Sequence, residues 1–598
     1  MSVAFTAYSL PLSTSGRWIV DATTGQRVKL MCVNWPSHME AMLVEGLQFK
    51  RLDDIAALIV KLRFNCVRLT YPIYMFTRYA NLTVQQSFQK LDLKEAITGI
   101  TQNNPSILNM TIVEAYVAVV DSLTAHGIMV VPDNHVSQPG WCCGNDDGNG
   151  FFGDRYFEPQ EWLQGLRLAA ETLKNKSHVV AMSLRNELRG GHQKEDVWYQ
   201  YMSEGAKLIH QINPNVLVVV SGLSYDTDLS FLKNRPMGFN LDNKLVFEIH
   251  LYSFSHNGRG WMSKPLNTFC ASSNQGFEDR AGFLVRGQNS TPLFVSEFGI
   301  DQTGADEGQN RFLNCFSTYL TENDFDWALW ALQGSYYRRD GMINSQETYG
   351  VLDSNFTGAK NPNFLHKFQL LQTKLQDPIS KQTTSFIMYY PLSGECVLTN
   401  EKNQLALGGC NRSYRWSHEK DGAPMRSVGS KLCLKAVGDG QPPILNEDCS
   451  SQQSAWKYAT YAKLQLASTN ERGQALCLQR DPTSGLIVTK NCMCLNDAEC
   501  REDPQSQWFK LVPSNAYSSP LSTNGRWIVD ATTGQRVKLM CVNWPGHMQA
   551  MLAEGLHLKP LDDIAASVGC KVAFQLRAFD LLNPHVHTPR QLDCSTIL

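Results

Sequence analysis

The sequence predicts an α/β protein in which a (β/α)8 TIM barrel is followed by an all-β module and then by a truncated duplicate of the start of the barrel. Three observations predict this order. Strand-like and helical patterns alternate through residues 1–378, three cysteine-containing repeats follow in residues 386–512, and residues 517–566 repeat residues 8–57 with 42 of 50 positions identical. A chain of 598 residues is too long for one ordinary core, so several domains are expected.

The first domain is expected to begin with a β-hairpin. Gly16–Asp21 and Gln26–Leu30 flank the turn-forming stretch Ala22–Gly25. Eight apolar runs are then predicted to be strands: Val28–Trp35, Phe64–Tyr71, Ile128–His135, Val179–Glu187, Val216–Gly222, Leu245–Ser253, Leu293–Gly299 and Phe325–Gln333.

Amphipathic stretches such as Glu161–Lys176 and Val197–Asn213 separate these runs and are predicted to be helices. Repeated alternation of strand and helix favours a parallel sheet, and eight repeats fit a closed barrel. An open doubly wound sheet is the alternative, but no glycine-rich dinucleotide fingerprint follows the first strand.

Two of the predicted strands end in a glutamate. Glu187 closes the stretch Ser183–Leu188, and Glu297 lies in Leu293–Gly299. An exposed glutamate at a strand end is by default a solvated charge. In a barrel, however, the carboxyl ends of the strands meet on the face that carries the active site. Two carboxyl groups there are what glycoside hydrolysis requires.

Further polar or aromatic side chains stand at the ends of the predicted strands. They are Arg68, His135, Asn186, His250, Tyr252 and Trp330. Any one of them alone would most simply be a solvated side chain. Together with the two glutamates they make eight residues converging on one face, so a functional site is the better interpretation.

These residues lie in motifs that together resemble glycoside hydrolase family 5, the cellulase family, over about residues 8–375. The motifs are Asn65-Cys66-Val67-Arg68, Asp133-Asn134-His135, Arg185-Asn186-Glu187, His250-Leu251-Tyr252, Ser296-Glu297-Phe298-Gly299 and Ala328-Leu329-Trp330. Within the family the chain is most similar to plant cellulase-like proteins that carry a lectin-like module behind the barrel.

The resemblance implies roles for the strand-end residues. Glu187 would be the acid/base, with a raised pKa, and Glu297 the nucleophile, kept ionised by Arg68 and Tyr252. Asn186 would bind the sugar 2-hydroxyl. The remaining residues would line the subsite of the cleaved sugar: His135, His250 and, as its floor, Trp330.

Other residues have weaker interpretations. Trp141, Trp261, Tyr336 and Tyr337 lie in predicted loops and are candidate platforms for further sugars, with ordinary loop packing as the alternative. Glu248, inside a strand, is expected to be structural. The loop around Asp146 and Asp147 lacks the spacing of an EF-hand, so it is expected to be solvated. No residue pattern requires a metal or a cofactor.

After a linker at 379–385, each of three repeats contains two cysteines and then a tryptophan. The sets are Cys396, Cys410 and Trp416; Cys433, Cys449 and Trp456; and Cys477, Cys492 and Trp508. Such repeats of about 40 residues suggest a symmetric all-β module whose units each close a disulfide, and Cys494 and Cys500 in an insertion form a further candidate pair. A zinc site is the alternative, although no CxxC…CxxC arrangement is present.

The module resembles a ricin-B-type β-trefoil over 386–512 but departs from the sugar-binding pattern of that family. Where the family usually has Asp, this chain has Leu398, Lys435 and Gln479, and where it usually has Gln, this chain has Tyr414, Ser454 and Ser506. A structural or substrate-docking module is therefore at least as consistent with the sequence as a working lectin.

The end of the chain is interpreted as an incomplete second copy. Residues 513–566 hold the partial repeat, and 567–598 are expected to be an irregular tail. The repeat stops before any counterpart of Arg68, so no second active site is expected. A strand that swaps into another barrel is the functional alternative.

The composition of the chain indicates which partners and which cellular compartment to expect. A net charge of −2 offers no case for nucleic acid or an anionic membrane, and no apolar run reaches the length of a membrane helix. No signal peptide is visible at the N-terminus, yet the 17 cysteines and the sequons at Asn81, Asn109, Asn175, Asn289, Asn355 and Asn411 indicate a secreted, extracellular protein of the cell wall.

The sequence as a whole predicts a monomeric, secreted, retaining endo-β-glycosidase that acts without a cofactor on β-1,4-linked cell-wall polysaccharide. A mannanase or xylanase of the same fold is one alternative, because the loops rather than the strand ends select the sugar. A catalytically weak carbohydrate-binding protein is the other.

Overall fold

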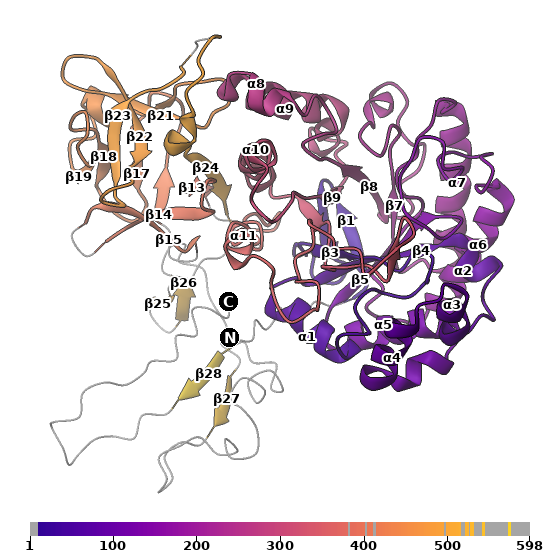
Figure 1. Ribbon diagram of the computed structural model, residues 1–598. Helices are drawn as coiled ribbons and strands as arrows, with labels where there is room; N and C mark the ends of the chain where they lie inside the picture. Colours follow the sequence, from indigo (N-terminus) through magenta and orange to yellow (C-terminus); the bar gives the residue numbers. More distant parts are fainter. Residues whose placement is uncertain are drawn as a thin grey trace, which may run out of the picture. The chain divides into compact units, whose positions relative to one another are not determined.

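The structure is a computed structural model of the chain. It describes residues 10–380, 383–400, 403–410, 414–495, 498–515, 521–524, 527–530, 541–544 and 572–575. The chain divides into two compact units (Figure 1). The larger unit comprises residues 9–379 and 384–514, and the smaller comprises residues 1–8, 380–383 and 515–598.

The larger unit contains a closed barrel of eight parallel strands, which confirms the predicted (β/α)8 fold. The strands are hydrogen-bonded in the circular order β10-β3-β4-β5-β6-β7-β8-β9. Their bounds are β3 Met31–Trp35, β4 Cys66–Pro72, β5 Met129–Val136, β6 Ala181–Ser183, β7 Leu217–Val220, β8 Leu245–His250, β9 Leu293–Phe298 and β10 Asp326–Leu329. Every residue of these strands is buried, which explains why they read as continuous apolar runs.

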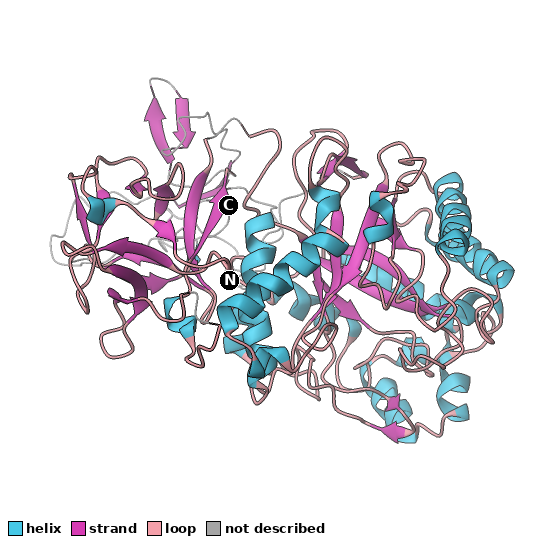
Figure 2. Cartoon of the chain, turned by 90° about the horizontal axis from the view of Figure 1, so that it is seen from above, coloured by secondary structure: helices cyan, strands magenta, loops and turns pink. Residues whose placement is uncertain are grey.

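Helices surround the barrel strands, as Figure 2 shows. They are α1 Leu52–Lys61, α2 Ile73–Thr77, α3 Val84–Lys90, α4 Lys94–Asn103, α5 Ile112–Ala125, α6 Pro159–Leu173, α7 Glu195–Ile212, α8 Gly260–Ser263, α9 Leu266–Arg280, α10 Glu307–Asn323 and α11 Pro362–His366. Some of them start with a side-chain cap: Thr111 and Glu114 form a reciprocal capping box at the start of α5. No helix in the described part of the chain has both the length and the apolar character to cross a membrane.

The predicted N-terminal hairpin forms in part, and β2 has a second partner that the sequence did not predict. β2 Trp18–Asp21 pairs antiparallel with β1 Leu12–Ser15, and it is joined to the predicted arm by an antiparallel bridge between Val20 and Arg27 with backbone hydrogen bonds on either side. The side chain of Arg27 forms a buried ion pair with Asp324. A short hairpin of β11 Arg338–Arg339 and β12 Met342–Ile343 also lies outside the barrel.

Four buried charges tie the entry of the first barrel strand to the entry of the last. Asp324, at the C-terminus of α10, pairs with Arg27 and with Lys29, whose Nζ lies 2.6 Å from Oδ1. Arg27 also lies 3.7 Å from Asp326. Although burial opposes ionisation, Arg27 and Lys29 hold the pKa of Asp324 below its usual range.

The second part of the larger unit is all-β. One sheet has the order β15-β14-β13-β16-β17-β18-β19, with β24 paired to β13, and the other has the order β20-β21-β22-β23. The bounds are β13 Ser385–Tyr390, β14 Glu395–Thr399, β15 Leu405–Gly408, β16 Arg415–Ser417, β17 Arg426–Ser427, β18 Cys433–Lys435, β19 Ile444–Asn446, β20 Lys457–Tyr458, β21 Leu466–Thr469, β22 Ala475–Arg480, β23 Ile487–Asn491 and β24 Lys510–Ser514. The three repeat tryptophans, Trp416, Trp456 and Trp508, are fully buried.

Each repeat of this module closes its own disulfide: Cys396–Cys410, Cys433–Cys449 and Cys477–Cys492, with Cys494–Cys500 in the insertion. Buried polar contacts join the module to two barrel helices. The side chain of Asn267 on α9 accepts a hydrogen bond from Trp508 Nε1 at 2.8 Å and donates one to Gln465 at 2.8 Å. Asn314 on α10 donates to Gln505 at 2.7 Å. Unpaired partners would be costly at such sites, so the contacts hold the two parts in register.

The smaller unit is described only in four strands. β25 Leu521–Asn524 pairs antiparallel with β26 Trp527–Asp530, and β27 Cys541–Trp544 pairs in parallel with β28 Val572–Gln575. β28 lies in the tail that was expected to be irregular, so that expectation is wrong for these four residues. In the first copy Asn34 stands opposite Arg68, whereas here Asn543 stands opposite Phe574. The remainder of the partial repeat and tail lies outside the described residues, as do the N-terminus and the sequon at Asn411.

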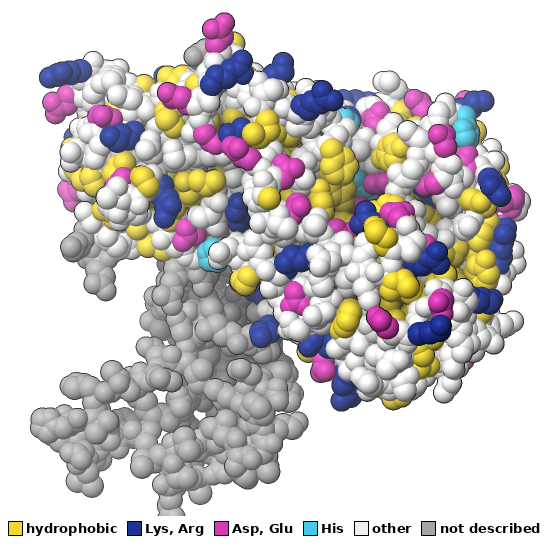
Figure 3. All heavy atoms as spheres, viewed as in Figure 1, with side chains coloured by type: hydrophobic (Ala, Val, Ile, Leu, Met, Phe, Trp, Pro, Cys, Tyr) yellow, Lys and Arg dark blue, Asp and Glu magenta, His cyan; other side chains and the backbone are white. Residues whose placement is uncertain are grey.

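On the face shown in Figure 3, basic and acidic side chains are interspersed and no area of a single sign dominates. This distribution agrees with the near-zero net charge. It provides no electrostatic footprint of the kind that polyanion-binding proteins have.

Candidate active site

Glu187 and Glu297 come together at the carboxyl-terminal mouth of the barrel. Glu187 follows β6 by four residues, and Glu297 is the penultimate residue of β9. A carboxyl oxygen of each and a ring nitrogen of His250 all lie within 4.8 Å of one another. Glu187 has a φ of 40°, a left-handed conformation that residues other than glycine rarely adopt and that is concentrated at functional sites.

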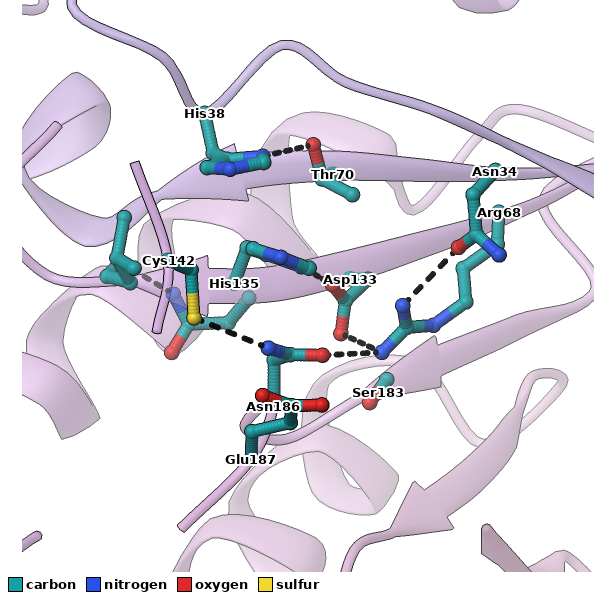
Figure 4. Close-up of polar contacts among 12 residues, drawn as sticks. Asn34, His38, Arg68, Thr70, Asp133, His135, Cys142, Ser183, Asn186 and Glu187 are labelled. Atoms are coloured by element: carbon teal, nitrogen blue, oxygen red, sulfur yellow. Dashed lines mark hydrogen bonds and ion pairs between the residues drawn. The ribbon is translucent and has the colours of Figure 1, made fainter. Parts of the chain in front are cut away.

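Arg68 organises the floor of this site (Figure 4). Its guanidinium is fully buried and donates to side chains from four other segments: Asn34 at 3.0 Å, Glu297 at 2.8 Å, Asp133 at 2.9 Å and Asn186 at 3.1 Å. The planar fork of arginine can serve several acceptors at fixed angles, which a lysine cannot. Arg68 therefore sets the relative positions of the nucleophile candidate and the amide beside Glu187.

The two glutamates have different hydrogen-bond donors. Glu297 accepts from Arg68 and from the hydroxyl of Tyr252 at 3.0 Å, whereas the carboxyl group of Glu187 is bonded only to Nδ1 of His250 at 2.9 Å among the described residues. Burial raises the pKa of both to about 7, although nearby cations oppose it. Donors to the charged form are concentrated on Glu297, which favours ionisation of that carboxyl group over ionisation of Glu187.

Aromatic and imidazole rings form one wall beside these carboxyl groups. The ring of His135 stacks on His38 with centroids 3.9 Å apart and on Trp330 with centroids 5.6 Å apart. Nδ1 of His135 lies 2.7 Å from Asp133. Burial holds the pKa values of His135 and His38 well below their usual range, so both rings are neutral and present flat apolar faces.

Comparison with known proteins matches the chain to a family. Residues 28–335, more than half of the chain, match the family described as cellulase (glycosyl hydrolase family 5). A "Glycosyl hydrolase 5 family protein" of Chamaecyparis obtusa is 44% identical over 530 residues, which cover 86% of this chain and 95% of that relative.

The chain belongs to glycoside hydrolase family 5. It is therefore a glycoside hydrolase, and a polysaccharide or oligosaccharide is its class of substrate.

More distant similarities accompany this family 5 match. An endoglucanase of Paenibacillus polymyxa is 22% identical over 371 residues, which cover 58% of this chain and 84% of the relative. The solved catalytic domain of the major endoglucanase of Xanthomonas campestris is 20% identical, with a TM-score of 0.49, covering 60% of this chain and 99% of that one.

All eight strand-end residues predicted for this family 5 hydrolase gather at the mouth of the barrel. Asn186 directs its amide toward the side of the site opposite Arg68. Its Oδ1 is taken by Arg68, while its Nδ2 has only two sulfur neighbours, Cys142 at 3.6 Å and Cys143 at 3.7 Å. Sulfur is a weak acceptor, so this amide hydrogen is available to a stronger acceptor on a sugar.

The further sugar platforms predicted from the sequence are placed differently. Trp261 is 2% exposed and packs edge-on against Phe269 and Phe312, and Tyr336 and Tyr337 are also buried. Trp261 belongs to the packing of α8 against α9 and α10, Tyr336 and Tyr337 belong to the packing of their loop, and none of the three has a free face for a sugar. Trp141 is half-buried, and the guanidinium of Arg339 covers one face of it at 3.5 Å.

Sequence reasoning assigned no site role to Asn34, His38, Asp133, Asp226 or Phe254. Asp133 was discoverable, because it precedes His135 by two residues and so shares its face of the strand. His38 and Asp226 lie in loops, where no periodicity marks them. Phe254 is 64% exposed, and its ring stacks on Tyr252 with centroids 5.0 Å apart, so an aromatic face is offered beside the nucleophile candidate.

Proposed function

We propose that the protein is a secreted, retaining endo-β-glycosidase acting on β-1,4-linked cell-wall glucan, with Glu187 as acid/base and Glu297 as nucleophile. The observation that carries this proposal is the unequal set of donors around the two carboxyl groups. A retaining enzyme needs one protonated and one ionised carboxyl group about 5–5.5 Å apart. Oxygens within 4.8 Å of each other fit that class rather than the wider spacing of inverting enzymes.

The reaction proceeds in two displacements. In the first, Glu187 gives its proton to the departing glycosidic oxygen while an oxygen of Glu297 attacks the anomeric carbon, so the glycosidic bond breaks and a glycosyl ester forms. In the second, Glu187 removes a proton from water, the water oxygen attacks the anomeric carbon, and the ester bond to Glu297 breaks. Arg68 and Tyr252 stabilise the carboxylate that enters and leaves this cycle.

Substrate is bound by the groups around these carboxyls. Nδ2 of Asn186 donates to the 2-hydroxyl, an interaction that strengthens in the transition state. Trp330, His135 and His250 line the subsite of the cleaved sugar, and Trp141 remains a candidate platform for a further sugar unit.

Two observations support secretion. Within the described residues, seven disulfides join fourteen cysteines, and such a density is typical of oxidising compartments. Five of the six sequon asparagines are exposed in the structure: Asn81, Asn109, Asn175, Asn289 and Asn355. We expect a glycosylated monomer.

We also propose domain limits at 1–378 for the catalytic domain and 386–512 for a ricin-B-like β-trefoil that serves mainly as a structural module. At the positions where sugar-binding trefoils carry Asp, this chain has other residues, and two of them contact neighbouring side chains of the module. Lys435 pairs with Asp448 at 2.8 Å, and Gln479 accepts a hydrogen bond from Gln507 at 3.0 Å. The partial repeat is proposed to span 513–566.

The proposal is tested by trapping the glycosyl ester. The full chain is used, because Trp508 and Gln505 of the module contact the barrel helices. Incubation with a 2-fluoro-β-cellobioside bearing a good leaving group should add one glycosyl unit to the peptide that contains Glu297, and Glu297→Gln should remove the label. No mass gain with this probe or with manno- and xylo-configured probes would overturn the retaining assignment. If only the manno- or the xylo-configured probe labels the protein, the proposed substrate sugar is wrong and the retaining mechanism stands.

A further inference from the structure

A second pair of carboxyl groups lies beneath the two glutamates of the site. Asp226 follows β7 and Glu248 lies in β8, and both side chains are completely buried. Carboxyl oxygens of both, together with a ring nitrogen of His250, lie within 4.8 Å of one another. Neither residue belongs to the set of strand-end groups that touch a sugar, so their presence here needs another explanation.

Each of these carboxyl groups has one satisfied and one unsatisfied oxygen. Oδ1 of Asp226 accepts from the backbone N–H of Gly222, and one oxygen of Glu248 accepts from the hydroxyl of Ser183. The other oxygen of each, Oδ2 of Asp226 and Oε2 of Glu248, is buried without a hydrogen-bond partner. One proton between them, shared directly or through a single water molecule, would satisfy both atoms.

The surrounding charges show why both groups cannot be ionised together. Five buried or nearly buried carboxyl groups lie around the guanidinium of Arg68, with Arg189 also acting on Glu187 and Arg185 on Asp133: Asp133, Glu187, Asp226, Glu248 and Glu297. Two carboxylates in close proximity and out of water hold a proton between them, as paired acids in other enzymes do. Burial, and then the charge of Glu248, raise the pKa of Asp226 well above its usual range.

His250 connects this pair to the acid of the proposed reaction. Its Nε2 lies 3.5 Å from Oδ2 of Asp226 and 3.1 Å from the hydroxyl of Ser296, while its Nδ1 lies 2.9 Å from Glu187. An ionised Asp226 would favour a second proton on the imidazole. The resulting cation would stabilise the carboxylate of Glu187 and deprive it of the proton that it must donate.

We propose that Asp226 and Glu248 share one proton, carried by Asp226, and that this proton keeps His250 neutral and so lets Glu187 keep its own. The pair then acts as positioning residues working through His250. The effect on Glu187 rests on its proposed role as acid, whereas the shared proton does not. A proton fits better than a metal ion, because the guanidinium of Arg68 already lies 3.5 Å from the unsatisfied oxygen of Glu248.

The activity test compares three isosteric variants of the full chain by the pH dependence of kcat/KM on a chromogenic cello-oligosaccharide. Glu248→Gln removes the charge that keeps Asp226 protonated, so the alkaline midpoint should fall by about one pH unit. Asp226→Asn mimics the protonated acid, so its midpoint should stay at the wild-type value. The double variant should return the midpoint to that value as well.

Glu45→Gln is the matched control, because Glu45 is a buried carboxyl group whose hydrogen bond comes from the backbone N–H of Tyr337 rather than from Arg68, His250 or Ser183. It should not move the midpoint. Equal midpoints in all variants, or a double variant that fails to recover, would overturn the proposal in favour of a purely structural pair. A stoichiometric metal ion that is removed by chelation and lost in Asp226→Asn would also overturn it.

A second measurement is independent of activity. Infrared difference spectra at pH 8.5 between wild type and either variant should show the loss of one carbonyl stretch of a protonated carboxyl group. Asp226→Asn removes the protonated carboxyl group, and Glu248→Gln lets Asp226 ionise. Either variant should therefore lose the band, so the test needs only one of them to fold. If neither spectrum loses such a band, no shared proton exists. If the band is lost but Glu297 is never labelled by the trapping probe, the shared proton stands and the proposed function fails.

Discussion

Replacing Glu187 with glutamine is expected to stabilise the protein at alkaline pH while it abolishes the proposed acid catalysis. Burial raises the pKa of Glu187 from its ordinary value of 4.5 to about 7, and the side chain is only 14% exposed. The folded state therefore binds this proton more strongly than the unfolded state does. The corresponding stability is fully present below pH 4.5 and is lost as the pH rises through 7.

The magnitude follows from the size of this shift. Each pKa unit corresponds to 1.36 kcal/mol, so an ionised Glu187 costs the folded state about 3 kcal/mol at pH 8.5. Glutamine can still accept the hydrogen bond from Nδ1 of His250 through its carbonyl oxygen, and it carries no charge at any pH. The variant should therefore match wild type at pH 4.5 and unfold a few °C higher at pH 8.5.

The assay is thermal unfolding followed by circular dichroism at both pH values. Glu171→Gln on the exposed side of α6 is the control, and its unfolding temperature should follow wild type at each pH. A Glu187→Gln difference that is the same at pH 4.5 and 8.5, or a variant that is less stable than wild type at pH 8.5, would refute the reasoning. Stability gained by removing a catalytic group is the usual trade-off where a site holds a charge away from water.

Three further outcomes are expected. Arg68→Lys keeps the charge but cannot serve several acceptors at once, so kcat/KM should fall by about 10²–10³-fold and labelling at Glu297 should slow in parallel; full activity would contradict the organising role of the guanidinium. Asp324→Asn keeps a residue that tolerates the left-handed backbone but removes the charge facing two buried cations, so urea unfolding should show a loss of about 3–5 kcal/mol; a loss below about 1 kcal/mol would show that the cluster is not strongly coupled. Trp508→Phe deletes the donor to Asn267, so calorimetry should resolve the melting of module and barrel into two transitions, and one unchanged transition would contradict the interface.

Much of the fold could be predicted because strands and helices have characteristic patterns of apolar residues in the local sequence. The barrel positions of Arg68, Glu187 and Glu297 were located to within a few residues from apolar runs that a parallel sheet buries on both faces, although β4 continues four residues past Arg68 and β6 ends four residues before Glu187. The cysteine spacing of the second module likewise predicted pairs within each repeat, and the structure joins Cys396 to Cys410. The additional pairing of β2 with β1 was not predicted, and neither was the buried ion pair of Arg27 with Asp324, which joins residues nearly 300 positions apart.

The side chains around the site were harder to predict. Trp261 and Tyr336 look like surface aromatics in loop sequences, yet the folded loops bury them. Asp226 carries no sequence signal that separates it from any loop aspartate. Its proximity to Glu248 exists only because β7 and β8 are neighbours in the barrel.

By itself the sequence determined which residues end the barrel strands, and hence that two glutamates share one face, because strand periodicity is a property of neighbours in the chain. The family resemblance implied that Arg68 and Tyr252 hold Glu297, but only the tertiary structure shows those contacts and the hydrogen bond between Glu187 and His250. That difference in donors supports the proposed division into proton donor and nucleophile. It depends on burial and on the charges that several strands contribute, and these groups surround the two glutamates only once the barrel has closed.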